Sequence, residues 1–279
     1  MRSTIQEANR MSGQTITNAS TINLSSGNIL NWNSLKRKVP KSSTEEIKFC
    51  LRQTLKCCLD QTCDQSCSLQ QDVITLTHPQ NTSSQKNVTR EEIKVTVKLL
   101  ITKTDEEEIT EALERVLKEL EIDKIDVLLL ALSKTPNVIE DNLTFEHLKP
   151  LWSELEDEVR KGRIVNLGIC DADKTMLEEL YEWATVKPII DQLNQDTCCV
   201  IPEDLKEYAK ANKIQLLTHN DKSDLLPPEE FQGVLAEFFP GADSERWYPA
   251  WTLRFTVLIR CRGVITTKGY ILKALKDRD

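Results

Sequence analysis

The chain has 279 residues, of which 39% are hydrophobic and 29% charged, and its formal net charge is −8. This length suits one large α/β domain or two small ones, and the acidic balance argues against an extended surface for nucleic acid or anionic lipid. No apolar run approaches the roughly 20 residues that span a bilayer. We therefore expect neither a nucleic-acid nor a membrane partner.

The N-terminal segment and the cysteines bear on localisation. The first 20 residues have no apolar core, so they do not resemble a secretory signal. Without such a signal, the nine cysteines are interpreted as reduced thiols of a cytoplasmic protein. Residues 1–28 are rich in Ser, Thr and Asn with little periodicity, and we expect them to form a flexible N-terminal arm.

The first regular element after the arm is a helix that begins near Ser43. Ser43 and Glu46 form a capping-box pattern, and Ile47, Leu51 and Leu55 follow at helical spacing. A polar stretch then contains a short strand at 72–77.

The pattern becomes clearer from residue 90 onward. Residues 92–102 mix β-branched and apolar side chains and predict a strand. Residues 105–120 predict an amphipathic helix with acids in its first turn. The run KIDVLLLALS (124–133) then predicts a buried strand.

The same alternation continues to the end of the chain. We expect helices at 144–160, 173–185, 202–212 and 247–259, strands at 163–169, 189–194, 214–218 and 263–267, and a C-terminal helix.

Short apolar strands that alternate with helices indicate a parallel sheet covered on both faces. Counting the weak strands 21–24 and 72–77, the pattern gives eight strands. Eight such units predict an α/β fold of the (β/α)8 TIM-barrel type over residues 29–279. An open doubly wound sheet is the alternative, although no Gly-rich turn of the dinucleotide-binding kind follows the first strand.

Common catalytic and metal motifs are missing from the sequence. It has no P-loop, no G-x-S-x-G elbow and no His pair at metal spacing. A cluster at Cys57, Cys58, Cys63 and Cys67, with His78 beyond it, contains no C-x2-C pair, so we predict no metal site there.

Three other cysteines and two tryptophans are candidates for contact with a partner. Cys198 and Cys199 follow the strand 189–194, at the end of the barrel where function concentrates. They are either ordinary loop residues or a redox-responsive thiol pair at an interface, joined by Cys261. Trp247 and Trp251 either contact a partner or pack the last barrel helix.

Several segments resemble the aldo-keto reductase superfamily. REEIKVTVKLL (90–100) resembles the strand that carries the family's catalytic lysine, which places Lys98 at that position. KIDVLLLALS resembles the next strand, which usually ends in a catalytic histidine, but this chain has Ala131 there. The family also needs an Asp and a Tyr acid, and residues 60–85, where these should lie, contain no tyrosine. Lys98 is therefore interpreted as vestigial, a partly buried and paired lysine.

The segments that resemble the family's cofactor site are also altered. Residues 151–173 are similar to its helix and G-x-S-N strand end, but Cys170 and Asp171 replace the Ser and Asn. Gln192 is retained, and His219 stands where an aromatic residue stacks on the nicotinamide. VITTKG (264–269) only partly resembles the phosphate clamp. We expect no cofactor, and the resemblance leaves vestigial NADPH binding through Gln192 and His219 open.

One branch of this superfamily matches longer blocks of the chain. Residues 26–40, 144–156, 173–188, 198–205, 214–221 and 262–272 resemble the regulatory (modifier) subunits of glutamate–cysteine ligase. This resemblance implies a non-catalytic protein that forms a heterodimer with the ligase's catalytic subunit, relieves its feedback inhibition by glutathione and improves its use of glutamate and ATP. The alternative is a divergent NADPH-dependent aldo-keto reductase.

Overall fold

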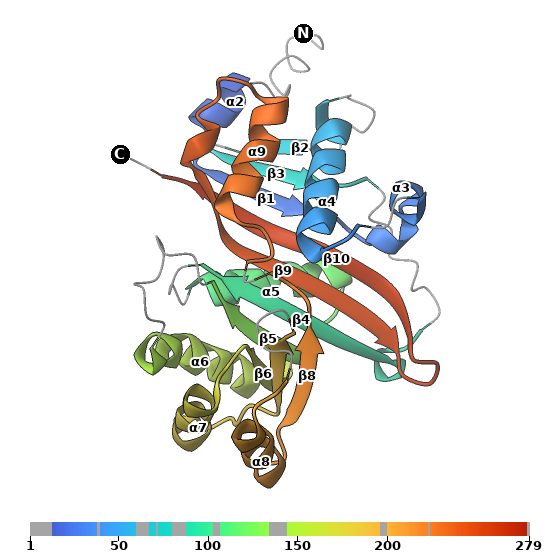
Figure 1. The fold of residues 1–279 in the computed structure, drawn as a ribbon. Helices are drawn as coiled ribbons and strands as arrows, with labels where there is room; N and C mark the ends of the chain where they lie inside the picture. Colours follow the sequence, from blue (N-terminus) through green and yellow to red (C-terminus); the bar gives the residue numbers. More distant parts are fainter. Residues whose placement is uncertain are drawn as a thin grey trace. The chain divides into compact units, whose positions relative to one another are not determined.

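The computed structural model describes residues 13–37, 40–59, 67–70, 72–79, 88–102, 107–133, 144–195, 200–222 and 224–277. The chain divides into two compact units. Unit 1 comprises residues 1–86, 226–252 and 267–279, and unit 2 comprises residues 87–225 and 253–266. Each unit combines helices with β-strands (Figure 1).

Unit 2 is built from parallel strands joined by helices. Its strands pair in the order β4 (Ile93–Ile101), β5 (Ile125–Leu132), β6 (Ile164–Cys170), β7 (Ile190–Asn194) and β8 (Gln215–His219). The connections contain α5 (Glu107–Leu120), α6 (Phe145–Arg160), α7 (Lys174–Trp183) and α8 (Glu203–Ala211). Figure 1 shows α6, α7 and α8 following one another along unit 2. The 3₁₀ helix η2 (Arg90–Glu92) leads into β4. The C-terminal part of β9 (Trp247–Ile259) lies beside β4.

Side chains on α6 fix the turn that leads into β7. The indole Nε1 of Trp152 donates to the carbonyl oxygen of Val186 at 3.0 Å. One oxygen of Glu156 accepts hydrogen bonds from the amides of Thr185 and Val186 at 2.7 and 2.9 Å. Because these buried polar groups are satisfied locally, the turn keeps the start of β7 in register with β6.

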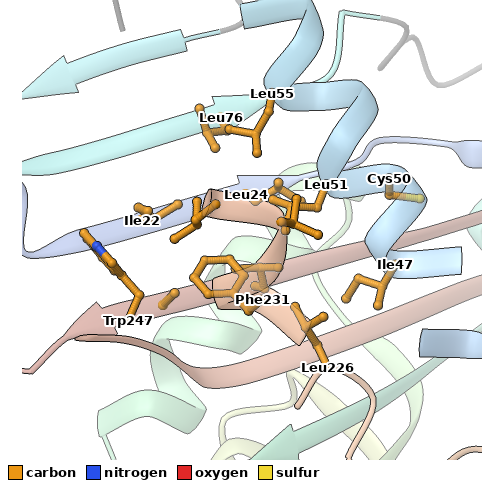
Figure 2. Close-up of a cluster of buried hydrophobic side chains, with 14 of the residues drawn as sticks. Ile22, Leu24, Ile47, Cys50, Leu51, Leu55, Leu76, Leu226, Phe231 and Trp247 are labelled. Carbon is orange, nitrogen blue, oxygen red and sulfur yellow. The ribbon is translucent and has the colours of Figure 1, made fainter. Parts of the chain in front are cut away.

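Unit 1 has a mixed sheet, in the strand order β2 (Cys67–Gln70), β3 (Val73–Thr77), β1 (Thr21–Ser25), β10 (Val264–Lys276) and β9. Its helical elements are α2 (Gly13–Asn18), α3 (Asn33–Arg37), α4 (Ser43–Leu59), α9 (Pro228–Phe238), η1 (Ile29–Asn31) and η3 (Ser244–Arg246). Figure 2 shows the core of this unit, where Leu51 of α4 and Phe231 of α9 meet Ile22 and Leu24 of β1. These four side chains are at most 1% exposed, so apolar burial holds the two helices on the strands.

The expected flexible arm, residues 1–28, partly belongs to this sheet. Residues 1–12 lie outside the described residues. β1 pairs in parallel with β3 and antiparallel with β10, and Ile22 is fully buried. Residues 21–25 are therefore part of the fold. The domain boundary at residue 28 stays a prediction.

The helix predicted at 247–259 is wrong, because this segment is the strand β9, and the predicted C-terminal helix is the strand β10. In the second half of β9, Leu253, Phe255 and Val257 are buried while the residues between them are half-buried. This period of two is typical of a strand, but the aromatic and apolar run around it also fits a helix. The two strands meet at a turn in which Gly263 has φ +63°.

The predicted α/β class is confirmed, and the parallel repeats of unit 2 are consistent with a (β/α)8 barrel of the aldo-keto reductase type. Unit 1 differs from the all-parallel alternation that we expected, since its pairs β1–β10 and β2–β3 are antiparallel. Among the helices in the described ranges, none is both long and apolar enough to cross a membrane.

Two glycines test the packing of the fold in opposite directions. A Cβ on Gly168 of β6 would lie 2.6 Å from Cδ2 of Leu129 and 2.9 Å from the carbonyl oxygen of Ile190. Gly168→Ala should therefore lower the free energy of unfolding by about 1–3 kcal/mol. A Cβ on Gly233 of α9 meets nothing within 4 Å, so Gly233→Ala should raise it by about 0.5–1 kcal/mol. Urea denaturation measures both, and equal stability of the two variants would contradict this packing.

Candidate functional site

A polar cluster lies at the carboxyl ends of the parallel strands of unit 2, the end where barrel proteins place their functional groups. β4 contributes Lys98, the segment after β8 contributes Asp221, and β9 contributes Arg254. The end of β8 contributes His219, and Asp171 follows β6 directly.

The carboxylate of Asp221 is the centre of this cluster. Lys98 Nζ donates to its Oδ2 at 2.9 Å. Arg254 donates from Nη1 to Oδ1 at 2.7 Å and from Nη2 to Oδ2 at 2.9 Å. The side chains of Lys98 and Asp221 are each 6% exposed. Bidentate pairing by arginine is among the stronger hydrogen-bonded contacts in proteins, and removal of one partner from such a buried pair typically costs about 3–5 kcal/mol.

His219 joins Asp221 to a second carboxylate. The backbone amide of Asp221 donates to His219 Nδ1 at 3.1 Å, and Nε2 of the same ring lies 3.1 Å from Oδ1 of Asp171. Because Nδ1 accepts a hydrogen bond, Nε2 is the ring nitrogen that donates to Asp171.

Asp171 and Asn194 close the network. Oδ1 of Asp171 accepts from the amide of Asn194 at 2.7 Å, and Nδ2 of Asn194 donates to the carbonyl oxygen of Asp221 at 2.7 Å. Burial acts to raise the pKa of Asp171, but the hydrogen bonds from His219 and Asn194 outweigh it, so this pKa lies below its ordinary value. Asp171 adopts φ +59°, an uncommon backbone conformation that Asp tolerates better than most residues.

The position of the lost histidine is filled by apolar packing. Ala131 is 5% exposed and packs in a cluster with Leu100, Cys170, Ile190 and Leu225. Burial raises the pKa of the Cys170 thiol to about 12, so the thiol stays protonated. Its Sγ lies 3.7 Å from Oε1 of Gln192.

These contacts bear on whether a nicotinamide cofactor fits. Lys98, Gln192 and His219 are each engaged by another group of the protein. Lys268, in the segment that partly resembles the phosphate clamp, lies in unit 1 with its Nζ 2.5 Å from a carboxylate oxygen of Glu46. The same carboxylate oxygen accepts from Tyr270 Oη at 2.6 Å. The residues present do not fit NADPH, and no hydride-transfer step follows from them.

Of the residues singled out from the sequence, the structure links His219 with Asp171, Cys170 with Gln192, and Ala131 with Cys170. It also shows Lys98 buried and paired, as interpreted. Sequence reasoning missed Asp221 and Arg254. A buried lysine requires a nearby carboxylate, which was a signal for Asp221. Arg254 was hidden because its segment was assigned to a helix.

The remaining candidates are scattered. Cys198 and Cys199 lie outside the described residues. Cys261 is a free, exposed thiol in the turn between β9 and β10. Trp247 and Trp251 are both fully buried, which favours packing over contact with a partner.

The cysteine cluster near residue 60 shows no metal arrangement in the part of the chain that the structure describes. Cys63 lies outside the described residues. Cys57 Sγ is 3.8 Å from His78 Nε2, and the His78 ring stacks on Trp32 with centroids 3.9 Å apart. Burial lowers the pKa of His78 to about 4, so the ring is neutral near pH 7.

The match to a known protein family lies largely within unit 2. The model of the aldo/keto reductase family matches residues 80–220. The chain is 40% identical over 268 residues to the glutamate–cysteine ligase regulatory subunit of Rattus norvegicus, which covers 95% of this chain and 96% of that one. It is 26% identical over 138 residues to NADPH-dependent codeinone reductase 1-1 of Papaver somniferum, covering 47% and 43% of the two chains.

A solved aldo-keto reductase enzyme from a Medee basin deep-sea metagenome library shares 27% identity over 48% of this chain and 45% of that one, with a TM-score of 0.40. The long match and the family model agree. The chain belongs to the aldo/keto reductase family, in the branch that contains the glutamate–cysteine ligase regulatory subunits.

Asp191 of β7 gives a pH-dependent test of this region. Its side chain is fully buried, and burial together with Asp171 and Asp173 raises its pKa to about 8. Between pH 4 and pH 8 the folded protein therefore holds a proton that the unfolded chain has released, and stability falls as the pH rises. Asp191→Asn replaces the titrating carboxyl group by an amide that does not titrate. The stability of the variant relative to the wild type should therefore increase from pH 5 to pH 8.

Urea denaturation at several pH values measures that difference. Asp123→Asn, at an exposed position, is the control and should follow the wild type at every pH. If the Asp191→Asn curve also runs parallel to the wild type, Asp191 does not hold the proton.

Proposed function

We propose that this chain is a non-catalytic regulatory subunit that binds the catalytic subunit of glutamate–cysteine ligase as a heterodimer. In that complex it relieves feedback inhibition by glutathione and improves the use of glutamate and ATP. The observation that carries this proposal is the 40% identity, over 95% of the chain, to a protein named glutamate–cysteine ligase regulatory subunit. A cytoplasmic setting belongs to the same proposal and is supported by the free thiols that the structure describes, among them Cys50, Cys170 and Cys261.

The site in unit 2 supports a role without catalysis. The lysine at the family's catalytic position is ion-paired with Asp221, and Ala131 offers no proton donor at the histidine position. The tyrosine that protonates the carbonyl oxygen in the family has no counterpart in residues 60–85 of this sequence. The parallel strands of unit 2 then serve as the scaffold for a binding surface.

Regulation by binding requires a difference in affinity. The chain has to bind the active form of the catalytic subunit more tightly than the inhibited form, because equal binding shifts no equilibrium. A tenfold change in the inhibition constant corresponds to about 1.4 kcal/mol of coupling free energy, which a modest interface supplies.

A divergent NADPH-dependent reductase is the second candidate. The observation that favours it is the family match over residues 80–220, together with the similarity to codeinone reductases. The altered polar cluster argues against it.

Cys261 and the pair Cys198 and Cys199 are assigned a redox role in this proposal. Cys261 is exposed and free in the β9–β10 turn, and Cys198 and Cys199 join it as the cysteines that would link the two subunits under oxidation. In that reaction two thiols lose two protons and two electrons to an added oxidant and form one disulfide.

The regulatory function is tested with the purified catalytic subunit. Addition of this chain should raise the inhibition constant for glutathione about tenfold and lower the KM for glutamate, because the chain stabilises the active form. Initial rates over a glutathione series measure this. The chain alone, with NADPH and a panel of carbonyl substrates, should show no turnover. An unchanged inhibition constant would refute the regulatory role, and reductase turnover would support the second candidate.

The redox assignment has its own test. After treatment of the mixed subunits with diamide, non-reducing gels should show a covalent heterodimer that disappears in the triple variant Cys198→Ser, Cys199→Ser, Cys261→Ser. Cys58→Ser, on α4 in unit 1, is the matched control and should leave the covalent heterodimer intact. A heterodimer band that persists in the triple variant would show that the link is made elsewhere.

A further inference from the structure

In the part of the chain that the structure describes, one edge of the unit 2 sheet carries no further strand. β8 is the last strand of this unit, and within the described residues it pairs with β7 alone (Figure 1). The backbone N–H of Gln215 donates to the carbonyl oxygen of Ile189 at 2.9 Å, and the carbonyl oxygen of His219 accepts from the backbone N–H of Gln195 at 2.8 Å. Alternate residues of a parallel strand bond to the same neighbour. Leu216 and Thr218 therefore direct their N–H and C=O groups away from β7.

These backbone groups form a template for another strand. Neither Leu216 nor Thr218 has a backbone partner outside its own strand pair among the residues that the structure describes. Together they present two N–H donors and two C=O acceptors along the edge. Natural sheets protect such edges with charges, prolines or bulges, but residues 215–218 are Gln-Leu-Leu-Thr. Gln215 and Thr218 are exposed, so the edge is accessible within unit 2.

Charge indicates what pairs there. Lys213 precedes the strand and Lys222 follows it, and both are exposed. Neither ammonium group has an ion-pair partner in the described part of the chain. Two cations therefore flank an uncharged edge in a protein whose net charge is −8. A second copy of this chain would bring the same two lysines to the same edge, and like charges disfavour that pairing. An extended segment whose central residues are flanked by carboxylates is complementary to this edge and its two lysines.

We propose that the open edge of β8 is the docking strand for an extended acidic segment of the ligase's catalytic subunit, which adds to the sheet by main-chain hydrogen bonding. This inference rests on the proposed function and names the surface through which it acts. Leu216 and Thr218 supply the hydrogen bonds, while Lys213 and Lys222 select an acidic partner and set its position.

The decisive variant is Thr218→Pro. Proline removes the outward N–H and blocks strand addition, whereas the ladder to β7 is kept because that N–H does not face β7. Thr218→Val keeps the N–H and the side-chain shape and is the matched control. Binding of each full-length variant to the purified catalytic subunit is measured by biolayer interferometry, with the melting temperature of each variant as the check on folding.

Thr218→Pro should raise Kd for the catalytic subunit at least tenfold, while Thr218→Val should bind as the wild type does. The double variant Lys213→Glu, Lys222→Glu leaves the backbone intact and should also weaken binding, with a loss that shrinks at high salt. This second variant decides the question if the proline variant fails to fold.

The outcomes distinguish a wrong docking site from a wrong proposed function. Wild-type binding that is equalled by the proline and charge variants overturns the edge as the docking site and leaves the proposed function standing. Failure of the wild-type chain to bind the catalytic subunit overturns both. A dimer of this chain alone that Thr218→Pro dissolves in light scattering would show that a second copy covers the edge, and would also overturn the proposal.

Discussion

The buried carboxylate of Asp221 is the interaction on which the organisation of unit 2 depends. It holds Lys98 on β4 and Arg254 on β9, and through its backbone amide it fixes the ring of His219 at the end of β8. Three strands are thereby tied at one point by groups that are almost completely removed from water. Asp221 carries one negative charge against the two positive charges of Lys98 and Arg254. A second carboxylate, that of Asp171, is connected to this group through His219. The network is satisfied within itself, which is what a low-dielectric site requires.

This self-satisfied network explains how a reductase-like scaffold is compatible with a regulatory role. A catalytic lysine has to tune the pKa of a neighbouring acid, but Lys98 is paired with a carboxylate that also binds an arginine. The site of the missing histidine is occupied by Ala131 and its apolar neighbours, which stabilise the strand ends by packing. Charge pairing and apolar packing have replaced the groups that perform chemistry, while the strands that carried them remain. Function then depends on the surface, where the open edge of β8 presents oriented backbone hydrogen-bonding groups.

The sequence predicted unit 2 well because its periodicity is strong. β4, α5, β5 and the following repeats each show a buried stripe or an apolar run of the right length, bounded by polar turns. The segment 247–276 failed because aromatic and apolar residues there fit either a helix or a strand, and only pairing with β1 and β4 decides between them. Of the site, Lys98 and Ala131 were found because a motif marks their places. The burial of Lys98 indicated a carboxylate partner, but Asp221 lies 123 residues away along the chain, so no local pattern identified it. Arg254 was missed because its segment was assigned to a helix and its partner Asp221 lies 33 residues away. The edge of β8 is likewise a property of the sheet, which no local pattern shows.

We expect the charged groups around Asp221, which pair with one another, to leave no binding site for NADPH. Isothermal titration of NADPH into the full-length chain measures this. We predict no saturable heat up to about 1 mM nucleotide, a concentration that detects affinities as weak as about −4 kcal/mol. Saturable binding of one NADPH per chain, lost on Lys98→Met in a variant that keeps its melting temperature, would show instead that the cluster around Asp221 still holds the cofactor.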